Sequence, residues 1–190
     1  RRSAKEGYPL TSSENRPAVG VIADDLTGAN ATGVLLTRTG YPTASLTELR
    51  WPEGGLDDYP CIVIATESRA APADEARRRV DAASRLLLDH GRRPMAKRID
   101  STLRGNVGPE VEAVLAALGP GSVAVVTGAF PASGRTARDG IHYVHGVPLA
   151  ETEVRNDPLC PVTESHVPTL VRSQTSLPVE LLPLARVRAG

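Results

Sequence analysis

The densest group of chemically capable side chains lies in residues 97–106, which read KRIDSTLRGN. This stretch combines basic, acidic, hydroxyl and amide groups with a glycine. Arginine binds carboxylates and phosphates through its planar fork, and aspartate accepts hydrogen bonds from hydroxyl groups. Glycine lets backbone N–H groups approach an anion closely. The stretch therefore predicts a binding loop for a small, anionic, hydroxyl-rich metabolite, although its basic half alone fits a phosphate equally well.

Three further polar clusters follow apolar runs that have the pattern of buried strands. They are residues 24–28 (DDLTG), 66–69 (TESR) and 130–135 (FPASGR). If these strands are parallel, all four clusters lie at the carboxyl edge of one sheet, where open α/β sheets bind ligands. Helix capping by Asp and Ser also makes such loops polar, but capping needs no Arg. Three of the four clusters contain Arg, which favours a binding site.

Strands and helices that could position these loops alternate along the chain. Strands are predicted at 18–23, 43–46, 59–65, 93–99, 122–127 and 179–184. Helices are predicted between the first cluster and Gly40, at 72–90, at 107–118 and near 165–173, and residues 141–143 and 147–149 are predicted to pair as a hairpin. This alternation predicts an α/β fold of three layers. A mostly parallel sheet would carry helices on both faces, with a small β-hairpin excursion.

The composition excludes several classes of partner. The 22 basic residues of this 190-residue chain balance its 22 acidic ones, and aromatic residues make up only 3%. We therefore expect no binding to nucleic acid, because neither a basic field nor a set of stacking platforms is present. No apolar run approaches the length of a membrane span, and the first residues do not resemble a signal peptide. We expect a cytoplasmic protein with a flexible arm at 1–17 and one domain at 18–190.

Familiar catalytic and metal-binding motifs are missing from the sequence. There is no GxxxxGK[ST] phosphate loop, no GxGxxG after a strand and no GxSxG elbow. His142 and His145 have a loosely metal-like spacing, but in a hairpin they would point to opposite faces. No metal site is predicted, and the catalytic residue is left unassigned.

Four blocks of the sequence, in order, resemble the amino-terminal substrate-binding half of the four-carbon acid sugar kinases, formerly a domain of unknown function. The blocks are VIADDLTGAN, KRIDSTLRGN, AFPASGRT and GIHYVHGVPLAET, the last followed by DPLCPV. The resemblance runs from about Val19 to the end of the chain. It implies ATP-dependent phosphorylation of a terminal hydroxyl on a sugar acid such as threonate, erythronate or an oxo-tetronate. In that family a second, carboxyl-terminal domain binds the nucleotide, and the substrate lies between the halves.

The resemblance also implies roles for individual residues. Asp24 and Asp25 would hold sugar hydroxyls. The acid pocket would be lined by Arg69, Lys97, Asp100, Ser101 and Arg104, in a loop shaped by Gly105 and Asn106. Ala31 departs from the family pattern, which usually carries Asp there, and this puts activity in question.

The sequence stops at Gly190, about where the family's nucleotide-binding half begins. We therefore expect no cofactor to bind this chain alone, and no phosphorylation without a nucleotide-binding domain in the same or a partner chain. ATP and Mg²⁺ are expected for the complete kinase. Two alternatives stay open: a stand-alone sugar-acid-binding or regulatory domain, and a sugar-acid isomerase or lyase that uses the same sheet edge.

Overall fold

A four-stranded parallel sheet forms the centre of the protein. The structure is a computed structural model that describes residues 17–189. The strands are β1 (Val19–Ala23), β2 (Thr43–Leu46), β3 (Cys61–Ala65) and β4 (Arg93–Arg98), in the order β2-β3-β1-β4. Neighbouring strands are parallel, and Ala23 at the end of β1 is in register with Ala65 at the end of β3. The predicted strands at 18–23, 43–46, 59–65 and 93–99 are confirmed.

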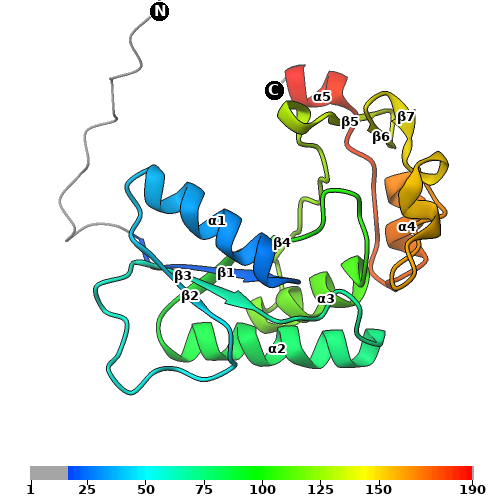
Figure 1. The fold of residues 1–190 in the computed structure, drawn as a ribbon. Coiled ribbons are helices and arrows are strands. Elements are labelled where there is room, and N and C mark those ends of the chain that lie inside the picture. Colours follow the sequence, from blue (N-terminus) through cyan, green and yellow to red (C-terminus); the bar gives the residue numbers. More distant parts are fainter. Residues whose placement is uncertain (1–16, 190) are drawn as a thin grey trace, which may run out of the picture.

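Helices cover both faces of this sheet (Figure 1). Helix α1 (Leu26–Arg38) lies on one face, and α2 (Ala73–Asp89) and α3 (Val107–Leu118) lie together on the other. Successive residues of a strand point to opposite faces. Ile22 accordingly packs with Val80 of α2, whereas Val21 packs in a cluster with Ala29 of α1. The predicted three-layer α/β architecture is confirmed.

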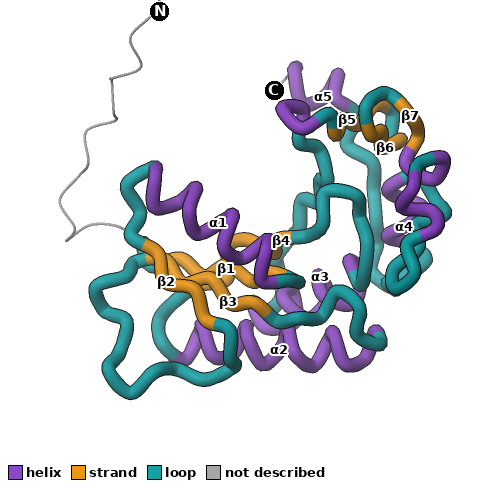
Figure 2. The backbone as a smooth tube through the Cα atoms, viewed as in Figure 1, coloured by secondary structure: helices purple, strands orange, loops and turns teal. Residues whose placement is uncertain are grey.

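A smaller lobe follows α3 in the chain (Figure 2). Its antiparallel sheet contains β5 (Arg135–Arg138), β6 (Ile141–Val144) and β7 (Val147–Pro148). Its helices are η2 (Pro131–Ser133), η3 (Leu149–Glu151), η4 (Glu153–Asn156), α4 (Val167–Arg172) and α5 (Leu184–Ala189). The predicted hairpin is confirmed, and β5 adds a third strand that the sequence did not indicate. Leu103 and Val107 pack with Val144 and Leu149 in one buried cluster, which joins the lobe to the central loop.

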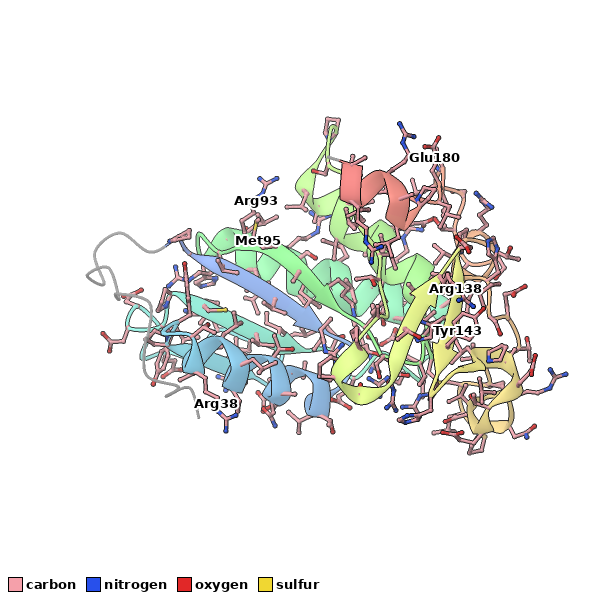
Figure 3. The ribbon with its side chains drawn as sticks, turned by 90° about the horizontal axis from the view of Figure 1, so that it is seen from above. Arg38, Arg93, Met95, Arg138, Tyr143 and Glu180 are labelled. Atoms are coloured by element: carbon pink, nitrogen blue, oxygen red, sulfur yellow. The ribbon has the colours of Figure 1, made fainter. Side chains whose placement is uncertain are left out.

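Two predicted strands are wrong. Residues 122–127 form no strand, and Val123 and Val125 are 86% and 85% exposed. Their β-branched pattern fits a strand, but this segment passes between the lobes without pairing with β4. Within residues 17–189 nothing pairs with the outer edge of β4, from which Arg93 and Met95 project (Figure 3).

The second wrong strand is 179–184, which is irregular until α5 begins at Leu184. Pro183 has no N–H group to donate to a strand ladder, which accounts for this break. The predicted arm at 1–17 lies outside the described residues except for Pro17. Among the helices of residues 17–189, none is both long enough and apolar enough to cross a membrane.

Candidate functional site

A bidentate ion pair joins the ends of β1 and β3. Asp24 directly follows β1 and is 3% exposed, and Arg69 lies four residues beyond the end of β3. Nε of Arg69 lies 2.7 Å from Oδ2 of Asp24, and Nη2 lies 3.1 Å from Oδ1. Burial alone would lower the pKa of Arg69, but the hydrogen bond to Asp24 and the surrounding carboxylates raise it overall. Because the pairing of β1 with β3 sets their ends side by side, two of the predicted polar clusters meet.

Asp25 serves both the helix and the ion-pair cluster. Its side chain accepts a 2.7 Å hydrogen bond from the N–H of Gly28 and so caps α1. Its other carboxylate oxygen lies 2.6 Å from Nη1 of Arg69. Helix capping, the alternative explanation for the polar residues 24–28, therefore does apply to Asp25. The same carboxylate also contacts Arg69, so capping does not exclude Asp25 from the site.

Asp100 and Arg104 bring the central loop into the same cluster. Arg104 binds both carboxylate oxygens of Asp100, through Nε at 2.9 Å and Nη2 at 3.1 Å. Oδ1 of Asp100 also lies 3.9 Å from Nη2 of Arg69. Burial would raise the pKa of Asp100, but hydrogen bonds from Arg104 and Thr102 and the two guanidinium charges hold it well below its usual range. Three of the four predicted clusters thus form one connected site, with Asp100 ionised.

The two guanidinium groups of the cluster are shared among four carboxylates. Besides its bonds to Asp100, Arg104 donates from Nη1 to Asp157 at 3.0 Å. With four carboxylates against two guanidinium groups, the formal charge of the cluster is negative. Each guanidinium has five N–H groups and uses three of them on close carboxylate contacts. The side chain of Arg104 is 31% exposed, against 19% for Arg69. An incoming anion would therefore meet Arg104 first, and ligand hydroxyls could donate to the aspartate oxygens.

Gly105 and Asn106 hold the central loop against the loop that carries Arg69. The side-chain amide of Asn106 donates to the backbone carbonyls of Ser68, Arg69 and Ala71 at 2.8–3.3 Å. Gly105 has a φ of +86°, and a Cβ there would stand 2.8 Å from the carbonyl oxygen of Arg69. Both residues therefore fix the backbone of the central loop against the loop that carries Arg69.

Two of the remaining predicted residues have partners outside the ion-pair cluster. The carbonyl oxygen of Ser101 accepts a 2.9 Å hydrogen bond from Nε2 of His142, a fully buried residue of β6. Nζ of Lys97 lies 2.6 Å from Oε2 of Glu110, and the side chain of Lys97 is only 6% exposed. Lys97 is thus paired beneath the site.

The fourth predicted cluster, residues 130–135, lies in η2 and at the start of β5, away from the parallel sheet. Arg135 donates to the carbonyl of Ser133 in its own loop. The expectation that all four clusters share one sheet edge is therefore wrong for this one, because the strand predicted at 122–127 does not form. Sequence reasoning also gave no role to Asp157 and Glu110. Asp157 lies in the quoted block DPLCPV, whereas nothing in the sequence singles out Glu110.

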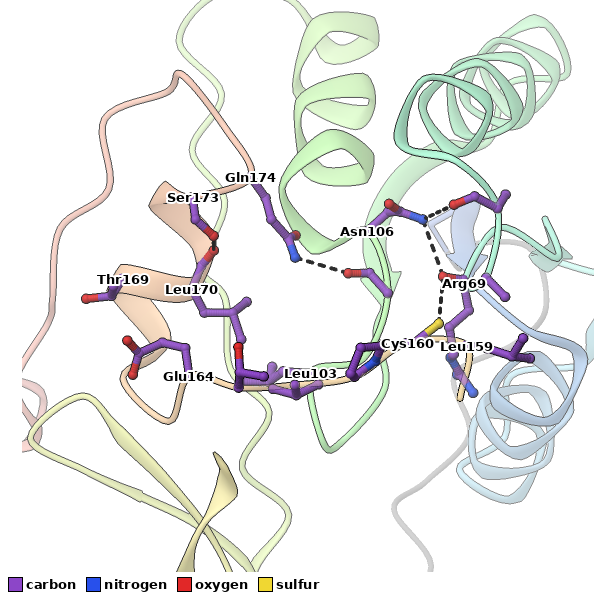
Figure 4. A pocket seen from close by; sticks show the side chains of 16 residues that line it. Arg69, Leu103, Asn106, Leu159, Cys160, Glu164, Thr169, Leu170, Ser173 and Gln174 are labelled. Atoms are coloured by element: carbon purple, nitrogen blue, oxygen red, sulfur yellow. Dashed lines mark hydrogen bonds between the residues drawn. The ribbon is translucent and has the colours of Figure 1, made fainter. Parts of the chain in front are cut away.

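A pocket of about 460 Å³ opens beside the cluster, between the central loop and the second lobe (Figure 4). Arg69, Gly105 and Asn106 of the two site loops line it, together with Cys160 and Gln174 of the second lobe, which donate to the carbonyls of Arg69 and Gly105. The aspartates of the cluster and Arg104 are not among the lining residues. Ligand pockets commonly measure 300–1,000 Å³, so this space suits a small metabolite. No group of three or more His, Cys, Asp or Glu residues within 17–189 is arranged to hold a metal ion.

His142 should make the stability of the protein depend on pH near neutrality. Burial lowers its pKa, and the hydrogen bond to Ser101 only partly opposes this. The unfolded chain, with a histidine pKa of about 6.5, then binds more protons than the folded chain, so stability falls as the pH drops below about 6.5. Urea unfolding between pH 5 and 8 should show this loss, and His142→Gln should reduce it.

The matched control is His166→Gln, at the start of α4, because the ring of His166 contacts Thr169 and not the carbonyl of Ser101. An equal loss of stability with pH in His142→Gln and in the unsubstituted chain would contradict the assignment.

The fold and the site together define a class of protein. A parallel sheet covered on both faces, with acidic and guanidinium groups gathered at its carboxyl edge, is an α/β domain that binds a small polar metabolite. A family model described as a sugar-binding N-terminal domain matches residues 19–190. The chain belongs to this sugar-binding N-terminal domain family.

Relatives with assigned names are longer than this chain. It is 49% identical to a D-erythronate kinase of Heliobacterium modesticaldum, over 90% of this chain and 39% of the relative. It is 43% identical to a D-threonate kinase of Salmonella typhimurium, over 90% of this chain and 40% of the relative. The chain therefore spans about 40% of the length of these kinases.

A solved structure has the same fold. A domain of unknown function from Bordetella bronchiseptica, crystallised with bound citrate as a domain-swapped dimer, aligns with a TM-score of 0.76 at 37% identity. The alignment covers 82% of this chain and 40% of that one.

Proposed function

We propose that this chain is the substrate-binding part of an ATP-dependent kinase that phosphorylates a four-carbon sugar acid. The single observation that carries the proposal is the bridging of Arg69 between the ends of three strands, through Asp24, Asp25 and Asp100. Family membership and the names of the relatives support a sugar acid as the ligand. The citrate bound by the Bordetella protein is a carboxylate, which agrees in chemistry with an acid ligand.

In this proposal each group of the cluster has a separate task. Asp24 and Asp25 accept hydrogen bonds from the sugar hydroxyls, and Asp100 keeps the guanidinium of Arg104 oriented. The ligand carboxylate accepts hydrogen bonds from those N–H groups of Arg104 that do not already bond to Asp100 or Asp157. Ser101 lies next to Asp100 in the central loop, and Gly105 and Asn106 fix that loop.

The nucleotide is proposed to come from a second domain, in the same polypeptide or in a partner. The donor set of this chain does not fit a nucleotide or its magnesium ion, because it has no phosphate loop and the clustered aspartates are committed to Arg69 and Arg104. ATP and Mg²⁺ therefore belong to the complete kinase. A cytoplasmic location is proposed with it, since the nucleotide donor is found there.

A second candidate function is sugar-acid binding without phosphorylation. Ala31 favours it, because this exposed residue of α1 stands where the resembled family usually carries Asp. A protein that joins this chain to a nucleotide-binding domain distinguishes the two. Transfer of phosphate from ATP to a sugar acid would support the kinase, and binding without transfer would support the second candidate. Turnover without nucleotide would indicate an isomerase or lyase instead.

Calorimetric titration of the chain with D-erythronate, D-threonate and 3-oxo-tetronate should show binding of at least one acid. Arg104→Ala should weaken that binding by about tenfold or more, because a charge-assisted bond to a carboxylate is lost. Arg85→Ala on α2 is the matched control, since Arg85 forms an exposed pair with Asp81 far along the helix. Failure of all three acids to bind would count against the proposed function.

A further inference from the structure

A buried ion pair lies directly beneath the candidate site. Glu110, in the first turn of α3, is 1% exposed, and its Oε2 lies 2.6 Å from Nζ of Lys97 on β4. Lys97 also donates to the carbonyl of Arg98 at 2.9 Å. Removing two charges from water is costly, and an apolar pair of similar size often packs with equal or better stability. Core packing alone therefore does not explain these two residues.

The ion pair continues into the loop that carries Arg69. The hydroxyl of Ser68 donates to Oε1 of Glu110 at 2.5 Å and lies 2.7 Å from the hydroxyl of Thr66. Ser68 and Thr66 are both buried. Each carboxylate oxygen of Glu110 thus has its own partner, one on β4 and one in the Arg69 loop.

The backbone between these two hydroxyls is strained. Glu67 has a φ of +47°, a left-handed conformation that is unfavourable for a residue other than glycine. Such a conformation persists only where the surroundings hold it. Ser68 lies between the strained residue and Arg69. The hydrogen bond from Ser68 to Glu110 therefore fixes the backbone position just before Arg69. The amides of Ser68 and Arg69 then both donate to the carbonyl of Asp24, at 3.0 and 3.3 Å.

We propose that Lys97 and Glu110 are positioning residues. They hold the strained turn at Glu67 so that the guanidinium of Arg69 keeps its ion pairs with Asp24 and Asp25. Lys97 in this proposal holds the carboxylate of Glu110 in place through their 2.6 Å contact and does not touch the ligand. The inference rests on the proposed function for its ligand. Its structural part, the holding of the turn, can be measured without any ligand.

The test uses the double variant Lys97→Met/Glu110→Leu, which removes both buried charges together and should keep the fold. Two results are expected in this variant. Amide hydrogen exchange at Ser68 and Arg69 should accelerate by about tenfold relative to the core of β3, because the turn loses its anchor. Affinity for the best-binding four-carbon sugar acid should fall by about tenfold or more. Glu112→Gln, also on α3, is the matched control and should change neither quantity, because Glu112 bonds Arg77, Thr175 and Ser176 and makes no bond to the loop that carries Arg69.

A rescue experiment separates positioning from direct contact. Asparagine tolerates the left-handed conformation better than glutamate does. Adding Glu67→Asn to the double variant should therefore recover part of the lost affinity and slow the exchange again. Lost affinity with unchanged exchange and no rescue would overturn the proposal and place Lys97 on the ligand. Unchanged affinity and exchange would also overturn it. If the unsubstituted chain binds none of the acids, the proposed function fails, while exchange in the variants still decides the positioning role.

Discussion

Replacing Asp24 with alanine is expected to lower the free energy of unfolding by about 3–5 kcal/mol, the usual effect of breaking a buried ion pair. The side chain of Asp24 is 4% exposed, and both of its oxygens bind Arg69. The alanine variant leaves the guanidinium of Arg69 largely enclosed, without its two short hydrogen bonds to Asp24. Urea unfolding with a two-state fit measures the change, and binding of sugar acids should be lost in the same variant.

Two companion variants make the Asp24 result specific. Asp81→Ala removes an exposed carboxylate whose partner on the next turn of α2 is Arg85, and should change stability by less than about 1 kcal/mol. Asp24→Asn keeps one oxygen acceptor for Arg69 and should fall between the unsubstituted chain and Asp24→Ala. A cost in Asp24→Ala no larger than that of the Asp81 control would mean that Arg69 does not depend on Asp24.

The residues of the site that follow strands could be predicted from the sequence because local pattern and position coincide there. The apolar run before Asp24 is strand β1 and the extended segment before Asp100 is strand β4, and parallel pairing brings their ends together with that of β3. Those facts place Arg69 near both aspartates without any knowledge of side-chain geometry. The choice of partners could not be predicted in the same way. The aspartates form most of the hydrogen bonds to the two guanidinium groups. Whether such bonds form depends on side-chain distances of a few tenths of an ångström, which the sequence pattern does not specify.

The errors of the sequence reading come from contacts between residues distant in the chain. Residues 122–127 have the composition of a buried strand, but whether such a segment joins a sheet depends on the path of the chain between lobes. Glu110 lies in an ordinary helical first turn, and its burial against Lys97 and Ser68 depends on the packing of α3 under two loops. A lysine in a polar motif fits a ligand or a buried carboxylate equally well. Only the three-dimensional arrangement shows that Lys97 has such a carboxylate.

Replacing Gly105 with alanine is expected to be the most disruptive single change in the central loop. The φ of +86° costs an alanine roughly 1 kcal/mol or more. In addition, its Cβ would stand 2.8 Å from the carbonyl oxygen and 2.9 Å from Cγ of Arg69, so the loop must move away. Overpacking of this kind typically costs about 1–3 kcal/mol. Together the two effects should lower the free energy of unfolding by roughly 2–4 kcal/mol and abolish sugar-acid binding.

Gly121→Ala separates these two effects, because Gly121 has the same φ of +86° and nothing within 4 Å of an added Cβ. Urea unfolding of both variants should show the conformational cost in each and the cost of the contact with Arg69 only in Gly105→Ala. Equal losses of unfolding free energy in the two variants would mean that the central loop moves away from the added Cβ at no cost. The close approach of Gly105 to Arg69 would then not be what holds the two loops of the site together. A larger loss in Gly105→Ala, with binding lost only there, would show that the site depends on the contact between the backbones of these two loops as well as on their charges.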